Sequence, residues 1–209
     1  MQLELPQNEL ERLVAKQLDH LFFFNTEAEL PLIRTGIQAA LGKCDSCFSS
    51  TGNKYYQRGG VPYFNPFHSG QYCIFLYFLS RAVFTAQPAA RLLADRIYYL
   101  NKALNGLDLF YEVEMPDIFF LDHPVGSVLG RATYGSHFAF SQNCTVGNNK
   151  GVFPVIGRNV QMMSGSKILG NCRIGDNVIL SANTYIKDTD IPPGSLVFGS
   201  SPHLIIKNR

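Results

Sequence analysis

The first half of the chain carries apolar residues at the spacing of helices. Six of them between positions 10 and 22 recur at intervals of three and four: Leu10, Leu13, Val14, Leu18, Leu21 and Phe22. This spacing forms one apolar stripe on a helix, and Asn8 is placed to cap it, with Glu11 three residues later. A second helix is expected from about Glu27 to Leu41, with Gly42 as its stop signal.

Two more helices are expected in this half. The third covers about Phe67 to Phe84, and the fourth begins at Pro88 and ends at Gly106. Between the second and third helices, Lys43 to Pro66 holds Gly, Ser, Asn and Pro without a clean period, so we expect a long loop over 43–66. Loops of that length are uncommon unless they act as lids or are mobile, and the sequence leaves the role of this one open.

After Gly106 the period of the apolar residues changes to six. Every sixth residue from position 156 is aliphatic or Met: Ile156, Met162, Ile168, Ile174, Leu180 and Ile186. Four residues after each of the first five stands a small or β-branched residue: Val160, Ser166, Cys172, Val178 and Thr184. Neither a helix nor a simple strand has this period, whereas one face of a triangular coil does. Glycines and asparagines between these positions suit corners that need a positive φ: Gly157, Gly165, Gly170, Gly175, Asn159, Asn171 and Asn177.

The same period extends towards the N-terminus. Counting backwards in sixes gives Cys144, Phe138 and Ala132 with a break at Lys150, and, after a slip of one residue, Ser127, Leu121, Met115 and Leu109. We therefore expect an α+β chain, with an all-helical N-terminal domain over 1–106 and a parallel β-helix of hexapeptide coils over 107–209. An ordinary β-sandwich with glycine turns is the alternative.

Composition limits the partners of this chain. The 18 basic and 16 acidic residues make up 16% of it, against about 25% in ordinary soluble domains, so part of the surface is expected to be covered by copies of the same chain. The net charge of +2 provides no field for binding nucleic acid by its phosphates. The apolar content of 46% excludes disorder.

We expect neither a targeting segment nor a metal site. The first thirteen residues contain acids and no apolar core, unlike a secretory signal, and the apolar run Tyr72–Phe84 is shorter than the roughly 20 residues of a membrane span. An odd number of scattered cysteines (Cys44, Cys47, Cys73, Cys144 and Cys172) fits a reducing cytoplasm better than a disulfide framework. Cys44 and Cys47 form a lone CxxC without further zinc ligands, and their role stays open.

The coils resemble those of the hexapeptide acyltransferases, whose fold is a left-handed parallel β-helix. Ile191–Pro202 is similar to the segment that closes this helix in many members. Within the superfamily the chain resembles the serine acetyltransferases, which place an all-helical domain before the β-helix. Phe119–Gly130 matches their catalytic stretch, and Gln142–Gly147 and Gly165–Gly170 match later coils. The resemblance covers roughly residues 67–209.

This resemblance implies an acyltransferase, an acetyl-CoA-dependent O-acetyltransferase with His123 as its general base. The base takes the proton of an acceptor hydroxyl while the oxygen attacks the thioester, which suits an imidazole because it titrates near neutral pH. The family pairs this histidine with an aspartate fifteen residues earlier, which is Asp108 here. A carboxylate on the second ring nitrogen fixes the tautomer and stabilises the imidazolium.

The resemblance also implies the binding residues and the assembly. Asp122 matches a residue that contacts the acceptor. Acetyl-CoA, the expected co-substrate, lies in this family along the groove between neighbouring β-helices. By position that implies four residues: Gly147, Ser164, Gly165 and Ala182. The resemblance also implies a homotrimer or a dimer of trimers, with these grooves between its chains.

Two positions depart from the family pattern. Serine acetyltransferases present an Arg–His pair directly before a proline, where this chain has Val152 and Phe153 before Pro154. An apolar pair cannot bind a carboxylate, whereas Phe153 suits the face of a sugar ring. We therefore expect a cytoplasmic enzyme that acetylates a hydroxyl on a sugar or a surface-polysaccharide precursor. The alternatives are an L-serine O-acetyltransferase of cysteine biosynthesis, N-acetylation of an amino sugar, and a non-catalytic β-helix scaffold.

Overall fold

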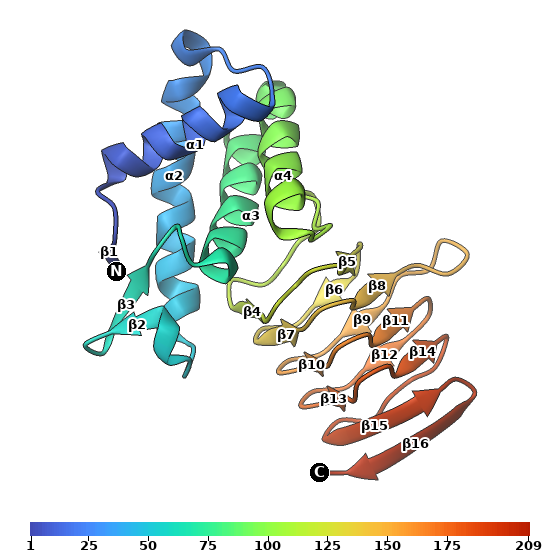
Figure 1. Cartoon of the computed structure of the whole chain (residues 1–209). Coiled ribbons are helices and arrows are strands. Elements are labelled where there is room, and N and C mark those ends of the chain that lie inside the picture. Colours follow the sequence, from blue (N-terminus) through green and yellow to red (C-terminus); the bar gives the residue numbers. More distant parts are fainter. The chain divides into compact units, whose positions relative to one another are not determined.

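The computed structural model describes residues 1–209 and divides into two compact units, Met1–Asn105 and Gly106–Arg209 (Figure 1). The first unit is helical and the second is built of short strands. None of the helices has the length and apolar character that crossing a membrane requires.

The helical unit contains four α-helices, α1 (Gln7–Leu21), α2 (Thr26–Ser49), α3 (Ser69–Ala86) and α4 (Arg91–Asn105). Two 3₁₀ turns accompany them, η1 (Lys54–Tyr56) and η2 (Pro88–Ala90). A small sheet has the order β1 (Gln2–Leu3), β3 (Val61–Phe64) and β2 (Gln57–Arg58), with β1 parallel and β2 antiparallel to β3.

Helix α3 forms the centre of this unit. It is apolar all round and buried over most of its length, because it packs on both α2 and α4. Gly36 allows the close approach of α2, since a Cβ at this position would lie 2.9 Å from Leu79 Cδ1. The largest fully buried side chains of the unit include Tyr77, Phe75 and Phe48. Side-chain burial therefore holds the helical unit together.

The expected long loop over 43–66 is wrong. Helix α2 continues through Gly42 to Ser49, and residues 54–64 form η1, β2 and β3. A glycine inside a helix costs about 1 kcal/mol, but the two turns that follow bury Cys44, Cys47 and Phe48 completely. That burial outweighs the glycine. The four helices themselves are confirmed, although α1 begins after Pro6 and Asn8 does not cap it.

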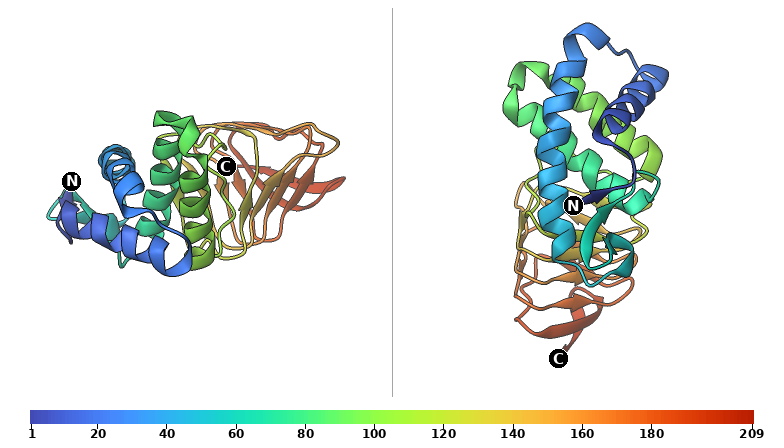
Figure 2. Two further views of the ribbon diagram at one scale, coloured as in Figure 1. Left: turned by 90° about the horizontal axis from the view of Figure 1, so that it is seen from above. Right: turned by 90° about the vertical axis from the view of Figure 1, so that its left-hand side faces the viewer.

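The second unit is a left-handed parallel β-helix with three faces. One face has the strand order β4 (Phe119–Leu121), β7 (Phe138–Phe140), β10 (Gln161–Met162), β13 (Ile179–Leu180) and β15 (Ser195–Ser200). The second contains β5 (Val128–Leu129), β8 (Thr145–Gly147), β11 (Lys167–Leu169) and β14 (Tyr185–Lys187). The third contains β6 (Thr133–Tyr134), β9 (Val155–Ile156) and β12 (Arg173–Ile174). Figure 2 shows the coils stacked as layers, and β16 (His203–Asn208) pairs antiparallel with β15.

The six-residue period is confirmed by the burial of the residues that carry it. All six residues from Ile156 to Ile186 at that spacing are 3% exposed or less, and so are the five small or β-branched residues between them. Each aliphatic residue stacks on its counterpart one coil later, as Ile156 does on Ile174 and Ile168 on Ile186. The hydrophobic core of the β-helix is therefore a set of continuous columns.

The backward count has the wrong phase before Lys150. The residues that pair with Ile156, Met162 and Ile168 are Tyr134, Phe140 and Val146. Cys144 and Phe138 are buried too, but they occupy the small-residue positions beside Ser166 and Val160. Ala132 is only partly buried, and it too occupies a small-residue position, the one that Pro154 and Cys172 hold in the next two coils. The shift arises because ten positions, and not six, separate Val146 from Ile156.

Positive φ angles mark the corners. Gly165, Gly170, Asn159 and Asn177 have φ between 54° and 80°, as expected. Asn171 lacks the expected positive φ, and so do Gly157 and Gly175. A Cβ on Gly157 would lie 2.8 Å from the backbone nitrogen of Asp176, so these two positions need glycine for close approach of the next coil.

Candidate active site

His123 occupies a corner of the β-helix. Strand β4 ends at Leu121, the backbone N–H of Asp122 donates to Phe140 O (3.0 Å), and the Val125 N–H donates to His123 O (2.8 Å). His123 itself has φ +50°. A positive φ is uncommon for residues other than glycine, and such strain gathers at functional sites. The corner turns the His123 side chain outwards, where 83% of it is exposed.

Asp122 lies beside this imidazole. Its Oδ1 is 3.4 Å from His123 Nε2, and 79% of its side chain is exposed. The distance is longer than a good hydrogen bond, and solvent screens an ion pair at such exposure. The resemblance implies that Asp122 contacts the acceptor, and nothing in the sequence predicts its contact with His123, which follows from the outward direction of both side chains at one corner.

The backbone at Asp108 lies beside residues 127–129, which follow the His123 corner. Its backbone N–H donates to Ser127 O (2.9 Å), and its carbonyl accepts from the Leu129 N–H (2.9 Å). The Gly126 N–H donates to Gly106 O (2.9 Å). The chain around Asp108 is therefore the coil stacked on the end of the His123 corner. The pairing of the two side chains stays a prediction.

Three of the four predicted acetyl-CoA residues lie at the equivalent corner of later coils. The corner of each coil is joined to the next by backbone hydrogen bonds: Asn143 N–H to Val125 O, Gly165 N–H to Gln142 O and Asn183 N–H to Ser164 O. Ser164, Gly165 and Ala182 belong to this column of corners. Ala182 is exposed and Ser164 is half-buried, while Gly165 has φ +72°.

Gly147 and Phe153 lie elsewhere. Gly147 ends β8, and the three residues of that strand span about 10 Å at 3.3 Å per residue. Phe153 follows a short hairpin after Gly147, with 43% of its surface exposed, and the preceding Val152 is 46% exposed. In a single chain the predicted site residues therefore form two groups at opposite ends of the β5–β8–β11–β14 face.

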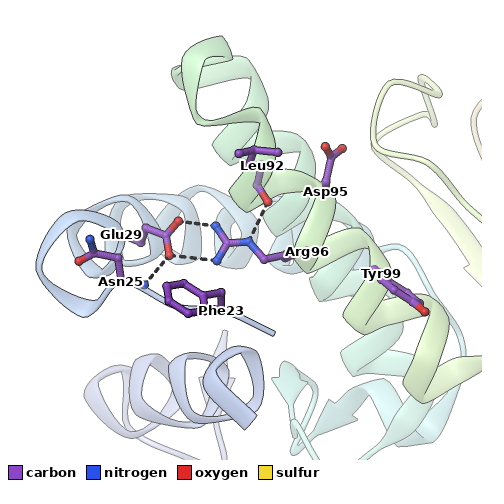
Figure 3. A pocket seen from close by; sticks show the side chains of 7 residues that line it. All are labelled: Phe23, Asn25, Glu29, Leu92, Asp95, Arg96 and Tyr99. Atoms are coloured by element: carbon purple, nitrogen blue, oxygen red, sulfur yellow. Dashed lines mark hydrogen bonds and ion pairs between the residues drawn. The ribbon is translucent and has the colours of Figure 1, made fainter. Parts of the chain in front are cut away.

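A hollow in the helical unit contains none of these residues (Figure 3). It measures about 360 Å³ and is lined by Phe23, Asn25, Glu29, Leu92, Asp95, Arg96 and Tyr99. The Arg96 guanidinium bonds both carboxylate oxygens of Glu29, and the Asn25 N–H donates to Glu29 Oε2 (2.9 Å). Burial raises the pKa of Glu29, but these hydrogen bonds outweigh it and hold the pKa below its usual value. The Glu29–Arg96 pair thus serves to join α2 and α4.

Two residues outside the predicted set support the Phe153 end of the face. The Asn149 side chain donates to Asp188, 39 positions later. No local spacing in the sequence predicts this contact, because the hairpin in the coil that contains Asn149 breaks the six-residue period.

Comparison with known proteins supports the fold and the family. The model of the bacterial transferase hexapeptide family (six repeats) matches residues 153–188. A serine acetyltransferase from Helicobacter pylori is 30% identical over 127 residues, which cover 54% of this chain and 73% of that protein. One from Staphylococcus epidermidis is 32% identical over 117 residues, which cover 54% of each. The chain thus spans about half the length of the staphylococcal relative.

Solved structures share the fold of this chain. The crystal structure of serine acetyltransferase from Vibrio cholerae has a TM-score of 0.71 at 18% identity, and the match covers 96% of this chain and 78% of that one. A serine acetyltransferase in complex with CoA has a TM-score of 0.67 at 18% identity, with 96% and 84% covered. The sequence identity to the Helicobacter protein and the hexapeptide coils agree with this fold. The chain therefore belongs to the serine acetyltransferase family of hexapeptide-repeat transferases.

Proposed function

We propose that the protein transfers the acetyl group of acetyl-CoA to the hydroxyl of a small acceptor. The observation that carries this proposal is the β-helix corner at which His123, Asp122, Ser164, Gly165 and Ala182 lie in one column, with Asp108 on the adjoining coil. An exposed imidazole on a rigid corner can reach a bound substrate without any change in the core. The name of the relatives supports the same activity.

His123 acts as the general base in this proposal. Its imidazole takes the proton from the acceptor hydroxyl while that oxygen attacks the thioester carbonyl carbon. When the tetrahedral intermediate collapses, the bond between carbon and sulfur breaks, and the imidazolium returns the proton to the departing CoA thiolate. Asp108 holds the ring orientation, and Asp122 contacts the acceptor or the imidazole.

The acceptor that the comparisons favour is L-serine. All the relatives named above are serine acetyltransferases, and no comparison supports an acceptor in polysaccharide biosynthesis. A second candidate is a hydroxyl compound without a carboxylate, because Val152 and Phe153 present exposed apolar surface where the resemblance implies Arg and His. Losing one charge-assisted hydrogen bond to a carboxylate costs about 1.5–3 kcal/mol.

The two groups of site residues suggest how the chains assemble. Gly147 and Phe153 are about one strand length from the His123 corner, so one copy places them at the other end of the face. A second β-helix packed alongside brings one copy's Phe153 end towards its partner's His123 corner. We therefore propose a homotrimer or a dimer of trimers with its sites between chains. Light scattering should give three or six times the 23.3 kDa of the chain, and a monomer would contradict the shared site.

The compartment proposed for this enzyme is the cytoplasm. All five cysteines are free and buried, which suits a reducing environment. The proposed reaction also requires acetyl-CoA, the acetyl donor, in the same compartment.

The test is CoA release followed with a thiol reagent. L-Serine is compared with nucleotide sugars, amino sugars and polysaccharide fragments. A kcat/KM for L-serine at or above about 10⁴ M⁻¹s⁻¹, the range of enzymes on their own substrates, supports the first candidate. A sugar that exceeds L-serine supports the second. No acceptor-dependent release with any compound would contradict acetyl transfer itself.

A further inference from the structure

A two-residue hairpin interrupts the β-helix after β8. Asn149 and Val152 exchange both backbone hydrogen bonds, at 3.1 and 3.0 Å. The residues between them, Lys150 and Gly151, have φ +51° and +79°, the pattern of a type I′ turn. The hairpin exposes Val152 and Phe153, whereas Asn171 and Thr189 stand at the corresponding corner of the two later coils.

The base of this hairpin is clamped to a later coil. Asn149 Nδ2 donates to Asp188 Oδ2 at 2.5 Å, and the Asn171 N–H donates to Asp188 Oδ1 at 2.8 Å. The backbone hydrogen bond from Asn171, aided by Asn149 and by the nearby charges of Lys187 and Lys150, holds the pKa of Asp188 below its usual value. The carboxylate is thus charged at neutral pH and accepts from two coils at once.

Gly170 lies in the middle of this clamp. It has φ +80°, and a Cβ there would lie 2.6 Å from the Asn149 Cβ and would also collide with the Asp188 carboxylate. Three successive coils are therefore in contact at one corner, through Asn149, Gly170 and Asp188. The absence of a side chain on the middle coil allows the outer two to meet.

The clamp leaves one residue between two fixed points. On one side, Val152 is bonded to the clamped Asn149. On the other side, Pro154 O accepts from the Thr133 N–H (3.0 Å) and the Val155 N–H donates to Cys172 O (2.9 Å). Phe153 lies between them. The geometry points to Asn149 and Asp188 as positioning residues that fix Phe153 and so set the acceptor selectivity of the enzyme, an inference that rests on the proposed function.

Because of the position of this clamp, its effect on acceptor selectivity can be distinguished from an effect on the catalytic base. Asn149 and Asp188 lie at the Phe153 end of the face, whereas His123 lies at the other end. Releasing the hairpin shifts the acceptor-contacting surface and leaves the base untouched. Because a displacement of about 1 Å at a positioning residue lowers productive binding steeply, we expect the acceptor KM to change far more than kcat or the KM for acetyl-CoA.

The experiment compares N149A with N159A. Asn159 donates the same kind of side-chain bond to Asn177 (2.9 Å) at a corner without a hairpin, and its φ of +54° makes alanine there at least as destabilising. N149A should raise the KM of the better acceptor about tenfold and reduce its preference over the second-best acceptor, with kcat nearly unchanged. N159A should keep the wild-type preference. Hydrogen exchange at the Val152 amide should accelerate in N149A only.

Two further variants test the bond itself. N149D places two carboxylates together and should affect selectivity more than N149A. The double variant N149D/D188N reverses donor and acceptor and should restore the wild-type preference and the slow exchange of Val152.

Each failure has its own signature. If N149A keeps the acceptor preference of a working wild-type enzyme, or if N159A changes it equally, the positioning role is wrong while the proposed function stands. If exchange at Val152 is unchanged in N149A, the clamp does not hold the hairpin and the inference is overturned. If the wild-type protein acetylates no acceptor, the proposed function fails and this inference fails with it.

Discussion

The two units of this protein obtain a defined structure by different means. All eight non-glycine residues with a positive φ belong to the β-helix, and the helical unit has none. The helical unit instead buries large side chains such as Tyr77, Phe75 and Phe48 around α3. Its order thus comes from side-chain packing, whereas the β-helix combines its buried columns with a backbone conformation at corners that neighbouring coils hold in place.

This difference explains where the candidate chemistry lies. A corner of the β-helix is rigid, yet its side chain contributes nothing to the core. His123 is 83% exposed on such a corner. In the helical unit the charged pair at the hollow, Glu29 and Arg96, is bonded internally and joins two helices. The comparison predicts that activity can be removed from the β-helix without loss of stability, and that stability responds differently to the same substitution in each unit.

The largest effect is expected from His123→Asn. Removing a general base lowers kcat by at least about 10²-fold, while the melting temperature should not fall, because asparagine tolerates the φ of +50° well. Asp108→Asn should lower kcat less. Steady-state CoA release and thermal unfolding by circular dichroism measure the two quantities. Near-full activity of His123→Asn would show that the base lies elsewhere.

Gly170→Ala tests the corners as the source of order. A left-handed conformation costs a residue with a Cβ about 1–2 kcal/mol, and crowding against Asn149 and Asp188 adds to it. We expect the free energy of unfolding to fall by about 2–4 kcal/mol in urea titrations. A change below about 0.5 kcal/mol would mean that the neighbouring coils yield easily, and the contrast between the two units would disappear.

Glu29→Gln tests the charged pair of the helical unit. Because the pKa of Glu29 is lowered in the folded protein, its stabilising effect is present above the unfolded-state pKa and is lost as pH falls through the folded one. The variant should be less stable than wild type by about 1 kcal/mol at pH 7. The two should converge once pH has fallen below the lowered pKa of the folded protein.

Asp176→Asn provides the matched control in the β-helix, where the Asp176–Arg158 pair is exposed. Little change is expected there, because solvent screens exposed pairs. A Glu29→Gln deficit that stays constant as the pH is lowered through the titration of Glu29 would argue that lost packing, and not charge, is the cause.

Apart from the Asp176→Asn control, the smallest effect is expected from Gly42→Ala, and its sign is opposite to that of Gly170→Ala. Gly42 lies inside α2 with open space around the position of a Cβ. Alanine there should raise the free energy of unfolding by about 0.5–1 kcal/mol. A loss of stability in the same urea titration would show that glycine has another role in this helix.

Much of the β-helix was predictable because its six-residue period appears in the spacing of apolar side chains. A residue such as Ile168 must be apolar since it lies between two coils, and the same requirement returns six residues later. The count failed across residues 147–154, because a hairpin adds four residues without adding an inward position. Lys150 signalled a break but not its length.

The helical unit was less predictable in its details. Glycine and serine at positions 42, 46 and 49 suggested a loop, yet the hydroxyls of Ser46 and Ser49 bond carbonyls one turn earlier within α2. Intrinsic propensity is a weak signal, and tertiary burial overrode it here. In the candidate site, the motif and its spacing indicated His123 and Asp108. The Asp122–His123 contact and the Asn149–Asp188 bond depend on corner geometry and coil stacking, which no local pattern contains.

The hairpin after β8 also has a consequence for how such a protein can change. Strands β8 and β9 on its two sides keep their register with the next coil, as Gly147 does with Leu169 and Ile156 with Ile174. A corner therefore accepts added residues while the ladder of strands stays intact. For an engineer, the segment between Gly147 and Pro154 is a place to graft loops of varied length and sequence onto an unchanged scaffold. For natural variation, it is, under the proposed function, a route to a new acceptor that does not require a new fold.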